Sequence, residues 1–587
     1  MIALSMKLTP GRRAALGALL LTLALLAVYG ASIGFEFVYD DHVQIERNPW
    51  LRDPDGFRLF LTRPFWDFYR DRGTGPSNYY RPLFGIAYSL TARGFGLQPA
   101  AYHAVSVALH LAVTLLVALG ARRLARSGTA GLAAGLLFAV YPPHAEAVSW
   151  VGGQADLLAA LFALLALFGY LEKKDRDSRD SRDSRDARGW VGAFLYLLAC
   201  LSKEPGAALI LVLGAVEISE WRREGSLGAA FRRGFARLAP YGLAAALYVA
   251  LRLHALGSFS PRSYGVTVSP AGALAYAAGL LARYLGFLIV PFPSRVLAGV
   301  PAPGLLSPVA IAGFLVALAA VAGLAAAAWH GRARREIVLP IAMILAFLLP
   351  VLAVNSIGGS NFSERYLYIP SIGLAWLFGL LCAGAAARLP ERARKAAAGA
   401  VLLLLVALGV AAWARSGIYR SDLTLFRAAV RTNPRSEIAR NNLGMALYNR
   451  GRIAEAEREY DEALRLIPQS VPPLANLGVL YEKRGERARA RKTFEEVLRL
   501  SPTHAISAVH LARMQRADGD RAGAGRRLDA LFAAGGENYE ALVERADLWL
   551  EDGHPEKAIP LLERAVRTFP DYSKGKDLLA HARGGKR

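Results

Sequence analysis

Two adjacent carboxylates, Asp40 and Asp41, stand shortly after the first long apolar stretch of the sequence. Ionisable side chains are costly to bury near the membrane, so at this depth they more often have a function than serve as ordinary surface residues. Desolvation raises the pKa of such a carboxylate, which suits it to take a proton from a hydroxyl group. We therefore expect a general base or a metal ligand here; a water-facing acidic pair at a helix end is the alternative.

Charged residues recur in later turns that are predicted to lie on the same side of the membrane. Arg81 follows two tyrosines and would act either as a phosphate ligand or as an anchor in the headgroup layer. Lys203 and Glu204 are neighbours, so they would neutralise each other unless Lys203 binds an anionic group. Glu364 and Arg365 open a late apolar stretch, where Arg365 would hold a phosphate or pair with Glu364.

A further turn offers His144, Glu146 and Asp156 as polar contacts to a substrate, although a hydrogen-bonded structural turn explains them equally well. No second histidine follows at a helical spacing, so we assign no metal ligands and expect no cofactor, while a divalent ion stays compatible with the carboxylates. Cys200 and Cys382 both lie in apolar stretches, which argues against disulfides and against a Cys-rich metal site.

The elements that must position these residues are apolar helices. Hydrophobic residues make up 54% of the 587 residues, and they gather in runs of about twenty, the length that crosses a bilayer. The net charge of +23 sits largely in short basic tracts between these runs, which is the positive-inside pattern and not a nucleic-acid surface. The sequence thus predicts an all-α, polytopic membrane protein with a cytoplasmic N-terminus. The expected eleven spans are 14–34, 101–121, 128–146, 154–171, 190–202, 205–221, 238–256, 306–329, 337–355, 366–387 and 396–414.

Three other segments complete this topology. Residues 35–100 form the external segment that carries the acidic pair. Residues 173–189 hold an Arg-Asp-Ser tract of low complexity, which we expect to be a disordered cytoplasmic loop. Residues 271–293 are apolar but are interrupted by Pro291 and Pro293, so we expect an external interfacial or re-entrant element. Eleven crossings then place the C-terminus on the side of the acidic pair.

After residue 415 the composition becomes that of a soluble helical domain with an internal period. Glycines and prolines recur every 34 residues, at Gly451, Gly485, Gly519 and Gly553 and at Pro434, Pro468 and Pro502. This is the pattern of the tetratricopeptide repeat (TPR), in which a glycine ends one helix and a proline ends the next. We therefore expect a membrane domain over 1–415 and a TPR solenoid over 416–587, whose groove would bind a polypeptide.

The order of the motifs resembles that of the transmembrane-and-TPR-containing O-mannosyltransferases, which belong to the GT-C glycosyltransferase superfamily. The resemblance is carried by Tyr39-Asp40-Asp41, Tyr80-Arg81-Pro82-Leu83, His103 to His110, Pro143-His144-Ala145-Glu146, Ser202-Lys203-Glu204, Glu364-Arg365-Tyr366-Leu367-Tyr368 and the repeats. It implies a GT-C-like membrane domain in which Asp40 and Asp41 are catalytic. It further implies a polyprenyl-phosphate sugar as donor, a protein hydroxyl as acceptor, and phosphate contacts at Arg81, Lys203 and Arg365.

The sequence therefore favours a glycosyltransferase of a bacterial inner membrane, with its TPR repeats on the periplasmic side binding the acceptor or a partner protein. The alternatives are a non-catalytic, membrane-anchored TPR scaffold for envelope assembly and a transporter for lipid-linked sugars. Eleven spans exceed what an anchor needs, and the symmetry between halves that a transporter predicts is not evident. The expected substrate contacts are Arg81, His144, Glu146, Asp156, Lys203, Glu204, Glu364 and Arg365.

Overall fold

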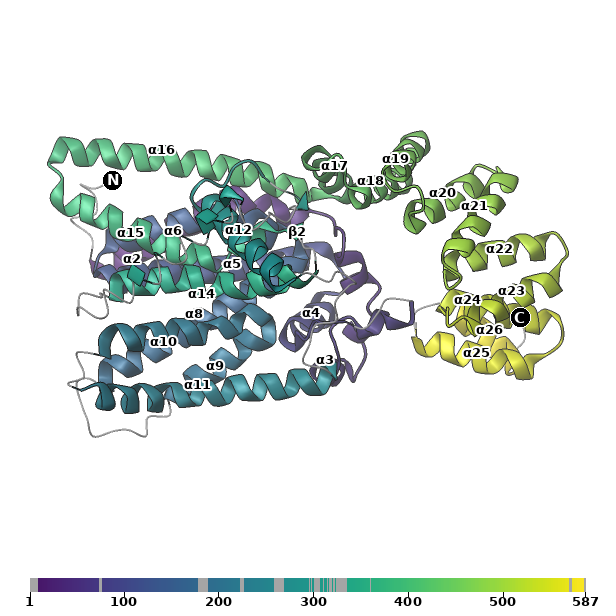
Figure 1. Ribbon diagram of the computed structural model, residues 1–587, viewed down its shortest axis with the longest axis horizontal. Coiled ribbons are helices and arrows are strands. Elements are labelled where there is room, and N and C mark those ends of the chain that lie inside the picture. Colours follow the sequence, from purple (N-terminus) through teal and green to yellow (C-terminus); the bar gives the residue numbers. More distant parts are fainter. Residues whose placement is uncertain are drawn as a thin grey trace. The chain divides into compact units, whose positions relative to one another are not determined.

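The chain folds into two compact units in a computed structural model (Figure 1). The membrane unit comprises Met1–His42, Phe57–Arg63 and Tyr80–Thr424, and the repeat unit comprises Val43–Gly56, Pro64–Tyr79 and Leu425–Arg587. The structure describes residues 9–72, 77–177, 188–221, 226–257, 269–294, 335–358, 361–568 and 573–584, with scattered positions between 296 and 323.

Helices of very different length build the membrane unit. The longer ones are α2 (Pro10–Tyr29), α4 (Pro82–Phe95), α5 (Pro99–Ala125), α6 (Gly128–Ala139), α8 (Gln154–Asp177), α9 (Arg188–Ser202), α10 (Leu209–Glu220), α11 (Leu227–Leu256), α12 (Pro270–Ile289), α14 (Arg335–Gly358), α15 (Pro370–Arg388) and α16 (Glu391–Ser416). Short helical turns join them, namely η1 (Gly30–Gly34), α3 (Gly56–Thr62), α7 (His144–Ser149), η5 (Val151–Gly153), η6 (Glu204–Ala208), η8 (Glu364–Leu367) and η9 (Gly417–Arg420). The strands β1 (Ala298–Gly299) and β2 (Asn361–Phe362) form one small antiparallel pair.

Eight helical segments in the described part of the chain are long and apolar enough to cross a membrane, which agrees with a polytopic, integral membrane protein. They are Gly11–Gly34, Pro99–Ala125, Val151–Asp175, Gly228–Leu256, Gly272–Ile289, Arg335–Leu352, Pro370–Arg388 and Glu391–Arg420. Apolar side chains such as Leu403 and Val410 on α16 are more than half exposed, as suits a helix face in contact with lipid.

Two expected segments differ in the structure, and the expectation for a third is not tested. Residues 271–293 contain α12, a continuous helix of spanning length whose two interrupting prolines follow its end, so the expected re-entrant element is a helix that could cross. The expected span at 205–221 is η6 followed by the twelve-residue α10. The expected span at 306–329 lies largely outside the described residues.

The start of the predicted disordered loop over 173–189 is ordered, which corrects that expectation. Helix α8 continues to Asp177, and α9 begins at Arg188; the tract between them lies outside the described residues. The ammonium group of Lys174 is buried and lies 2.8 Å from Glu217 and 3.6 Å from Glu220, both on α10. This buried pairing extends α8 beyond the apolar stretch, because the lysine gains partners that a solvated loop would not give it.

Close helix contacts hold the core beneath the charged turns. Helix α5 packs against α6, α8 and α15, and α6 also packs against α15. A Cβ atom on Gly379 of α15 would lie 2.5 Å from the carbonyl oxygen of Ala130 on α6. Glycine at this position therefore lets the two helix backbones approach closely, as in many membrane helix pairs.

The repeat unit contains consecutive helical hairpins, seen from α18 to α26 in Figure 1. Each predicted turn glycine has a positive φ, namely +75° at Gly451, +78° at Gly485, +88° at Gly519 and +78° at Gly553, where a side chain would be strained. Its helices are α17 (Asp422–Thr432), which begins in the membrane unit, α18 (Glu437–Asn449), α19 (Ile453–Leu466), α20 (Val471–Lys483), α21 (Arg487–Leu500), α22 (Ala505–Ala517), α23 (Arg521–Ala533), α24 (Tyr539–Glu551), α25 (Pro555–Thr568) and α26 (Ser573–Ala582), with the turns η2 (His42–Glu46), η3 (Pro49–Leu51) and η4 (Asp67–Arg72).

Candidate active site

The acidic pair lies on a tight turn between η1 and η2. Tyr39 has a φ of +55°, an unusual value for a residue with a side chain. Asp41 is fully buried, and both of its carboxylate oxygens are held by backbone groups. The N–H of Gly152 donates to Oδ1 (2.9 Å), and the N–H of Val38 donates to Oδ2 (3.2 Å). Asp40 is only partly buried, so Asp41 shapes the turn while Asp40 is the more accessible carboxylate.

Burial perturbs both carboxyl groups. It raises the pKa of Asp41 to about 8, against the two backbone hydrogen bonds, which favour the ionised form. It raises the pKa of Asp40 to about 6, against the positive charge of Arg365, which favours the carboxylate. A carboxyl group with a pKa of about 6 is still mostly ionised at neutral pH, yet it is a far stronger base than a solvated aspartate.

Arg365 is the cation that acts on Asp40. Its guanidinium lies 2.9 Å from Glu146, and its backbone N–H donates to the same carboxylate at 3.2 Å. The guanidinium also lies 4.6 Å from the ring centroid of Trp150. The expected alternative, a pair between Arg365 and its neighbour Glu364, is wrong, because the turn η8 sends the two side chains to different partners.

Lys203 and Asp156 form a buried pair in the same region. The ammonium nitrogen is 2.6 Å from each carboxylate oxygen, and both side chains are almost completely buried. Burial lowers the pKa of Lys203 to about 8, Asp156 opposes this change, and the charges of Arg365 and Arg81 add to it. The three cations that the sequence suggested as phosphate contacts therefore lie within electrostatic reach of one another.

Arg81 pairs with Glu204, and a second arginine joins them. The guanidinium of Arg81 lies 2.9 Å from the Glu204 carboxylate, and that of Arg252 on α11 lies 3.6 Å from it. Although burial acts to raise it, the pKa of Glu204 is lowered by these two cations. Lys203 thus pairs with Asp156 and not with the adjacent Glu204, and Arg252 is a cation of the site that the sequence reading did not single out.

Two expected substrate contacts have other partners. His144 is fully buried; Nδ1 lies 2.9 Å from the carbonyl oxygen of Phe138 and Nε2 lies 2.7 Å from the hydroxyl of Ser371. Glu364 is buried against Arg415 (2.8 Å) and accepts a hydrogen bond from Ser294 (2.9 Å). Both residues brace the elements around the site and do not join the cluster of Asp40, Lys203 and Arg365.

The turn of the acidic pair is also braced from the far end of the membrane unit. Oδ1 of Asp422 accepts a hydrogen bond from the N–H of Tyr39 (2.8 Å), and Oδ2 lies 3.0 Å from Nε2 of His42. The carbonyl oxygen of Arg420 accepts a hydrogen bond from the N–H of Glu36 (3.1 Å). Asp422 was missed from the sequence, because no local pattern marks a residue that acts about 380 positions away.

No group of three or more His, Cys, Asp or Glu side chains within the described residues is arranged to hold a metal ion. The described residues do bring together a carboxylate of raised pKa, Asp40, and a cluster of cations. Four cations, Arg81, Lys203, Arg252 and Arg365, balance the carboxylates of Glu146, Asp156, Glu204 and Asp40. Cations held in place in this way can stabilise an anion without rearranging.

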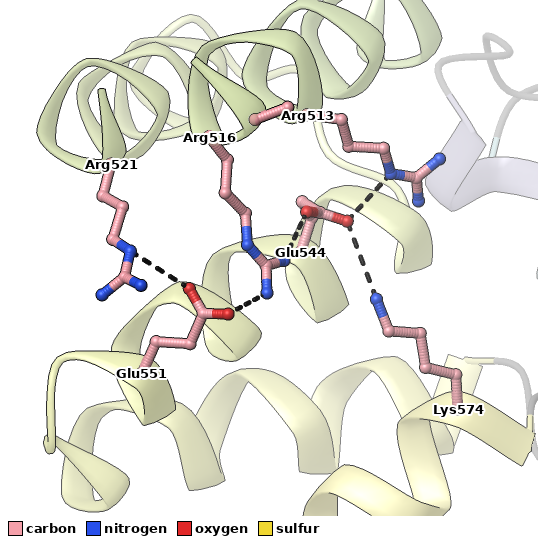
Figure 2. A pocket seen from close by; sticks show the side chains of 7 residues that line it. Arg513, Arg516, Arg521, Glu544, Glu551 and Lys574 are labelled. Carbon is pink, nitrogen blue, oxygen red and sulfur yellow. Dashed lines mark hydrogen bonds and ion pairs between the residues drawn. The ribbon is translucent and has the colours of Figure 1, made fainter. Parts of the chain in front are cut away.

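A second charged cleft lies within the repeat unit, between α22, α24 and α26. It has a volume of about 490 Å³ and is lined by Arg513, Arg516, Ala517, Arg521, Glu544, Glu551 and Lys574. Figure 2 shows Glu544 between Arg513 and Lys574, with Arg516 reaching both Glu544 and Glu551. Only 3% of the Glu544 side chain is exposed, so the cations in this cleft neutralise an acid that is already buried.

Comparison with known proteins finds matches to the repeats and to most of the chain. A family model described as tetratricopeptide repeat matches residues 406–471 and 509–573, and a second model of the same description matches residues 474–505. Human protein O-mannosyl-transferase TMTC4 is 28% identical over 74% of this chain and 64% of its own length. Mouse protein O-mannosyl-transferase TMTC2 is 25% identical over 75% of this chain and 61% of its own length.

The chain is a relative of the protein O-mannosyl-transferases. The resemblance expected from the order of the motifs is thus confirmed, although the chain spans just under two thirds of the length of these curated relatives. Among solved structures, an oligosaccharyltransferase of Archaeoglobus fulgidus is 14% identical, with a TM-score of 0.39 over 69% of this chain and 55% of that one. A thermophilic TPR protein of Thermus thermophilus is 21% identical, with a TM-score of 0.24 over 31% of this chain and 94% of that one.

Proposed function

We propose that the protein is a membrane glycosyltransferase that moves a mannose-like sugar from a polyprenyl-phosphate donor to a serine or threonine hydroxyl of a polypeptide. The printed names of the relatives support transfer of mannose to protein. The single observation that carries the proposal is that the charge of Arg365 reaches Asp40 electrostatically, because this brings a base of raised pKa within range of the first of several cations.

Asp40 is the general base in this proposal. Its carboxylate takes the proton of the acceptor hydroxyl while that oxygen forms a bond to the anomeric carbon of the sugar. The bond from the anomeric carbon to the phosphate oxygen breaks at the same time, so the configuration inverts and polyprenyl phosphate leaves. Asp41 is fixed by two backbone N–H groups and holds the turn in the geometry that presents Asp40.

The cations stabilise the negative charge that develops on the departing phosphate. Arg365, Lys203 and Arg81 influence one another electrostatically, and Arg252 shares the carboxylate of Glu204 with Arg81. Preorganised cations in a buried site stabilise developing charge strongly, because they need no rearrangement during the reaction. Glu146, Asp156 and Glu204 keep each cation in place before the donor binds.

The repeat unit binds the acceptor polypeptide or a partner protein, as extended solenoid surfaces commonly do. In this proposal the acidic pair and the repeats lie on the external face of a bacterial inner membrane, which the basic tracts between the apolar stretches support. The donor is then reached from the outer leaflet, where its lipid tail stays in the bilayer.

Purified full-length protein in nanodiscs tests the proposal. With polyprenyl-phosphate mannose and a Ser/Thr-rich acceptor peptide, Asp40→Asn should lower the turnover number at least about a hundredfold. The matched control Asp67→Asn changes an acidic residue outside the candidate site and should retain wild-type turnover. Wild-type transfer by Asp40→Asn, or no transfer by the unmodified protein with any polyprenyl-linked sugar, would favour the scaffold alternative.

A further inference from the structure

Two buried polar groups near the acidic pair have no hydrogen-bond partner among the residues that the structure describes. They are the indole N–H of Trp150 and the hydroxyl of Tyr88. Trp150 is 7% exposed and Tyr88 is not exposed at all. Buried polar groups in native proteins are nearly always hydrogen-bonded, because an unmade bond destabilises the fold. Both groups are therefore available to bond to a bound ligand.

Trp150 lies between the acid pair and the first cation. A Cβ atom on Gly152 would lie 2.7 Å from the indole ring, and the N–H of the same glycine donates to Asp41. The ring centroid of Tyr39 is 6.0 Å away, and the guanidinium of Arg365 lies 4.6 Å from the indole ring. The indole ring is thus held beside the turn of the acidic pair by Gly152 and Arg365.

Tyr88 approaches the same pair from α4. Its ring packs against Phe84 (4.3 Å between centroids) and Tyr102 (5.5 Å). Burial, together with the negative charges of Asp41 and Asp40, raises the pKa of Tyr88 well above its ordinary value. The hydroxyl is therefore a permanent donor at neutral pH, placed within electrostatic reach of two carboxyl groups.

The kind of ligand follows from these neighbours. The two donors are neutral, and an anion placed between them would be repelled by the carboxylates, whereas a phosphate suits the cations around Lys203 and Arg365. A sugar hydroxyl both accepts a hydrogen bond from a neutral donor and donates one to a carboxylate. A pyranose offers several such hydroxyls at fixed positions.

We propose that the indole N–H of Trp150 and the hydroxyl of Tyr88 bind hydroxyl oxygens of the sugar that is transferred, and so form a hexose subsite beside Asp40. The inference rests on the proposed function, since it names the group that the donor carries into that site. It assigns sugar selectivity to two neutral hydrogen-bond donors that do not act as the base.

Two residues of the same unit serve as matched controls because they make the bonds that Trp150 and Tyr88 lack. The indole N–H of Trp376 donates to the carbonyl oxygen of Val117 (3.0 Å), and the hydroxyl of Tyr141 donates to that of Leu288 (2.6 Å). Replacing either by Phe removes a bond that the fold already has. Trp150→Phe and Tyr88→Phe remove donors that the protein itself leaves unused.

The test measures binding of two probes, polyprenyl-phosphate mannose and polyprenyl phosphate without sugar, to the full-length protein in nanodiscs. The wild type should bind the sugar-bearing probe at least tenfold more tightly. Trp150→Phe and Tyr88→Phe should each lose most of that difference and keep their affinity for the sugar-free probe. Tyr88→Phe, which removes only the hydroxyl, should also unfold at an unchanged or higher temperature. Trp376→Phe and Tyr141→Phe should unfold at a lower temperature and keep the difference.

Three results would overturn the proposal. One is a wild type that binds both probes equally. Another is a pair of variants, Trp150→Phe and Tyr88→Phe, that lose thermal stability like their controls and keep the sugar-dependent difference. The third is an effect confined to the KM of the acceptor peptide, which would assign the donors to the acceptor. Activity retained by Asp40→Asn would instead refute the proposed base and leave this binding result standing.

Discussion

The two units each bury a carboxylate, and the contrast between Asp41 and Glu544 shows what burial does with and without cations. Asp41 is completely buried and is held by two neutral backbone N–H groups. Glu544 is 2% exposed and is held by the guanidinium groups of Arg513 (2.9 Å) and Arg516 (3.0 Å), with Lys574 at 3.8 Å. In the first arrangement burial raises the pKa of Asp41; in the second, three cations surround the buried carboxylate.

The same contrast separates a reactive site from a structural one. Around the acidic pair, raised pKa values and unpartnered donors leave polar groups ready for a substrate. In the cleft of Figure 2, Arg516 contacts Glu544 and Glu551, and it also pairs with Asp547. Its donors are used inside the repeat unit, so this cleft stabilises the stacking of α22 on α24 more than it offers a site.

The largest expected effect comes from removing one cation of the candidate active site. Arg365→Met should lower transfer about a hundredfold or more, because it removes a cation from the leaving-group side of the site. Since the charge of Arg365 holds the pKa of Asp40 below the value that burial alone would give, the acidic limb of the pH–rate profile should also move to higher pH. Rates for the full-length protein from pH 5 to 9 measure both changes.

Arg513→Met is the control from the repeat unit, where a cation of the same type pairs with a buried acid. It should leave the turnover number and the acidic limb unchanged. Equal losses of turnover in the two variants would mean that the arginines act through folding, and the contrast would fail.

The second effect is the pH dependence of stability. The pKa of Asp41 is raised by burial to about 8 in the folded protein, against an ordinary value near 4. The folded state therefore binds this proton more tightly than the unfolded state, so stability falls as pH rises from about 4 to 8. Asp41→Asn removes the titrating group, and the slope of unfolding temperature against pH in that window should become flatter.

The matched variant is Glu544→Gln, which should leave this slope unchanged and lower the unfolding temperature of the repeat unit at every pH. The variant removes the ion pairs of a buried acid with Arg513 and Arg516, a loss of about 1–3 kcal/mol. Differential scanning calorimetry of the full-length variants from pH 4 to 9 measures both quantities. An unchanged slope in Asp41→Asn would contradict the assignment.

The third effect concerns the brace on the acidic turn. Asp422→Asn keeps the size of the side chain but weakens its bonds to Tyr39 and His42, and transfer should fall about tenfold through the turnover number. Thr424→Val is the control, since it removes the hydroxyl that accepts a bond from the N–H of Ser421 at the start of α17 and does not touch the turn. If both variants lose the same activity, Asp422 acts only by starting the helix.

These residues also show what the sequence could and could not reveal. The acidic pair and the three cations were predictable, because charged residues at the ends of apolar stretches stand out and their order matches a family. The 34-residue period predicted where the turns of the repeats lie. The glycines at these turns have positive φ angles, which glycine adopts without strain. Such signals depend on neighbouring residues or on a fixed spacing, so they can be recognised in the sequence alone.

Partner choice was not predictable in the same way. Adjacency suggested that Lys203 would pair with Glu204 and Arg365 with Glu364, but the helical turns point neighbouring side chains in different directions. The contacts of Asp422 join positions nearly 400 residues apart, and the unpartnered state of Trp150 depends on everything packed around it. Such features depend on the three-dimensional packing, so no fixed spacing in the sequence predicts them.

The smallest expected effect concerns two arginines of the cleft in the repeat unit that differ in exposure. The Arg521 side chain is 55% exposed and lies 3.6 Å from Glu551, whereas that of Arg516 is 26% exposed and bridges three carboxylates. Arg521→Gln should therefore change the unfolding free energy by no more than about 0.5 kcal/mol, since exposed pairs are screened by water and salt. Arg516→Met should lower it by several times as much. Equal losses, measured by urea unfolding, would mean that the cleft is held by its overall charge and that burial does not rank its arginines.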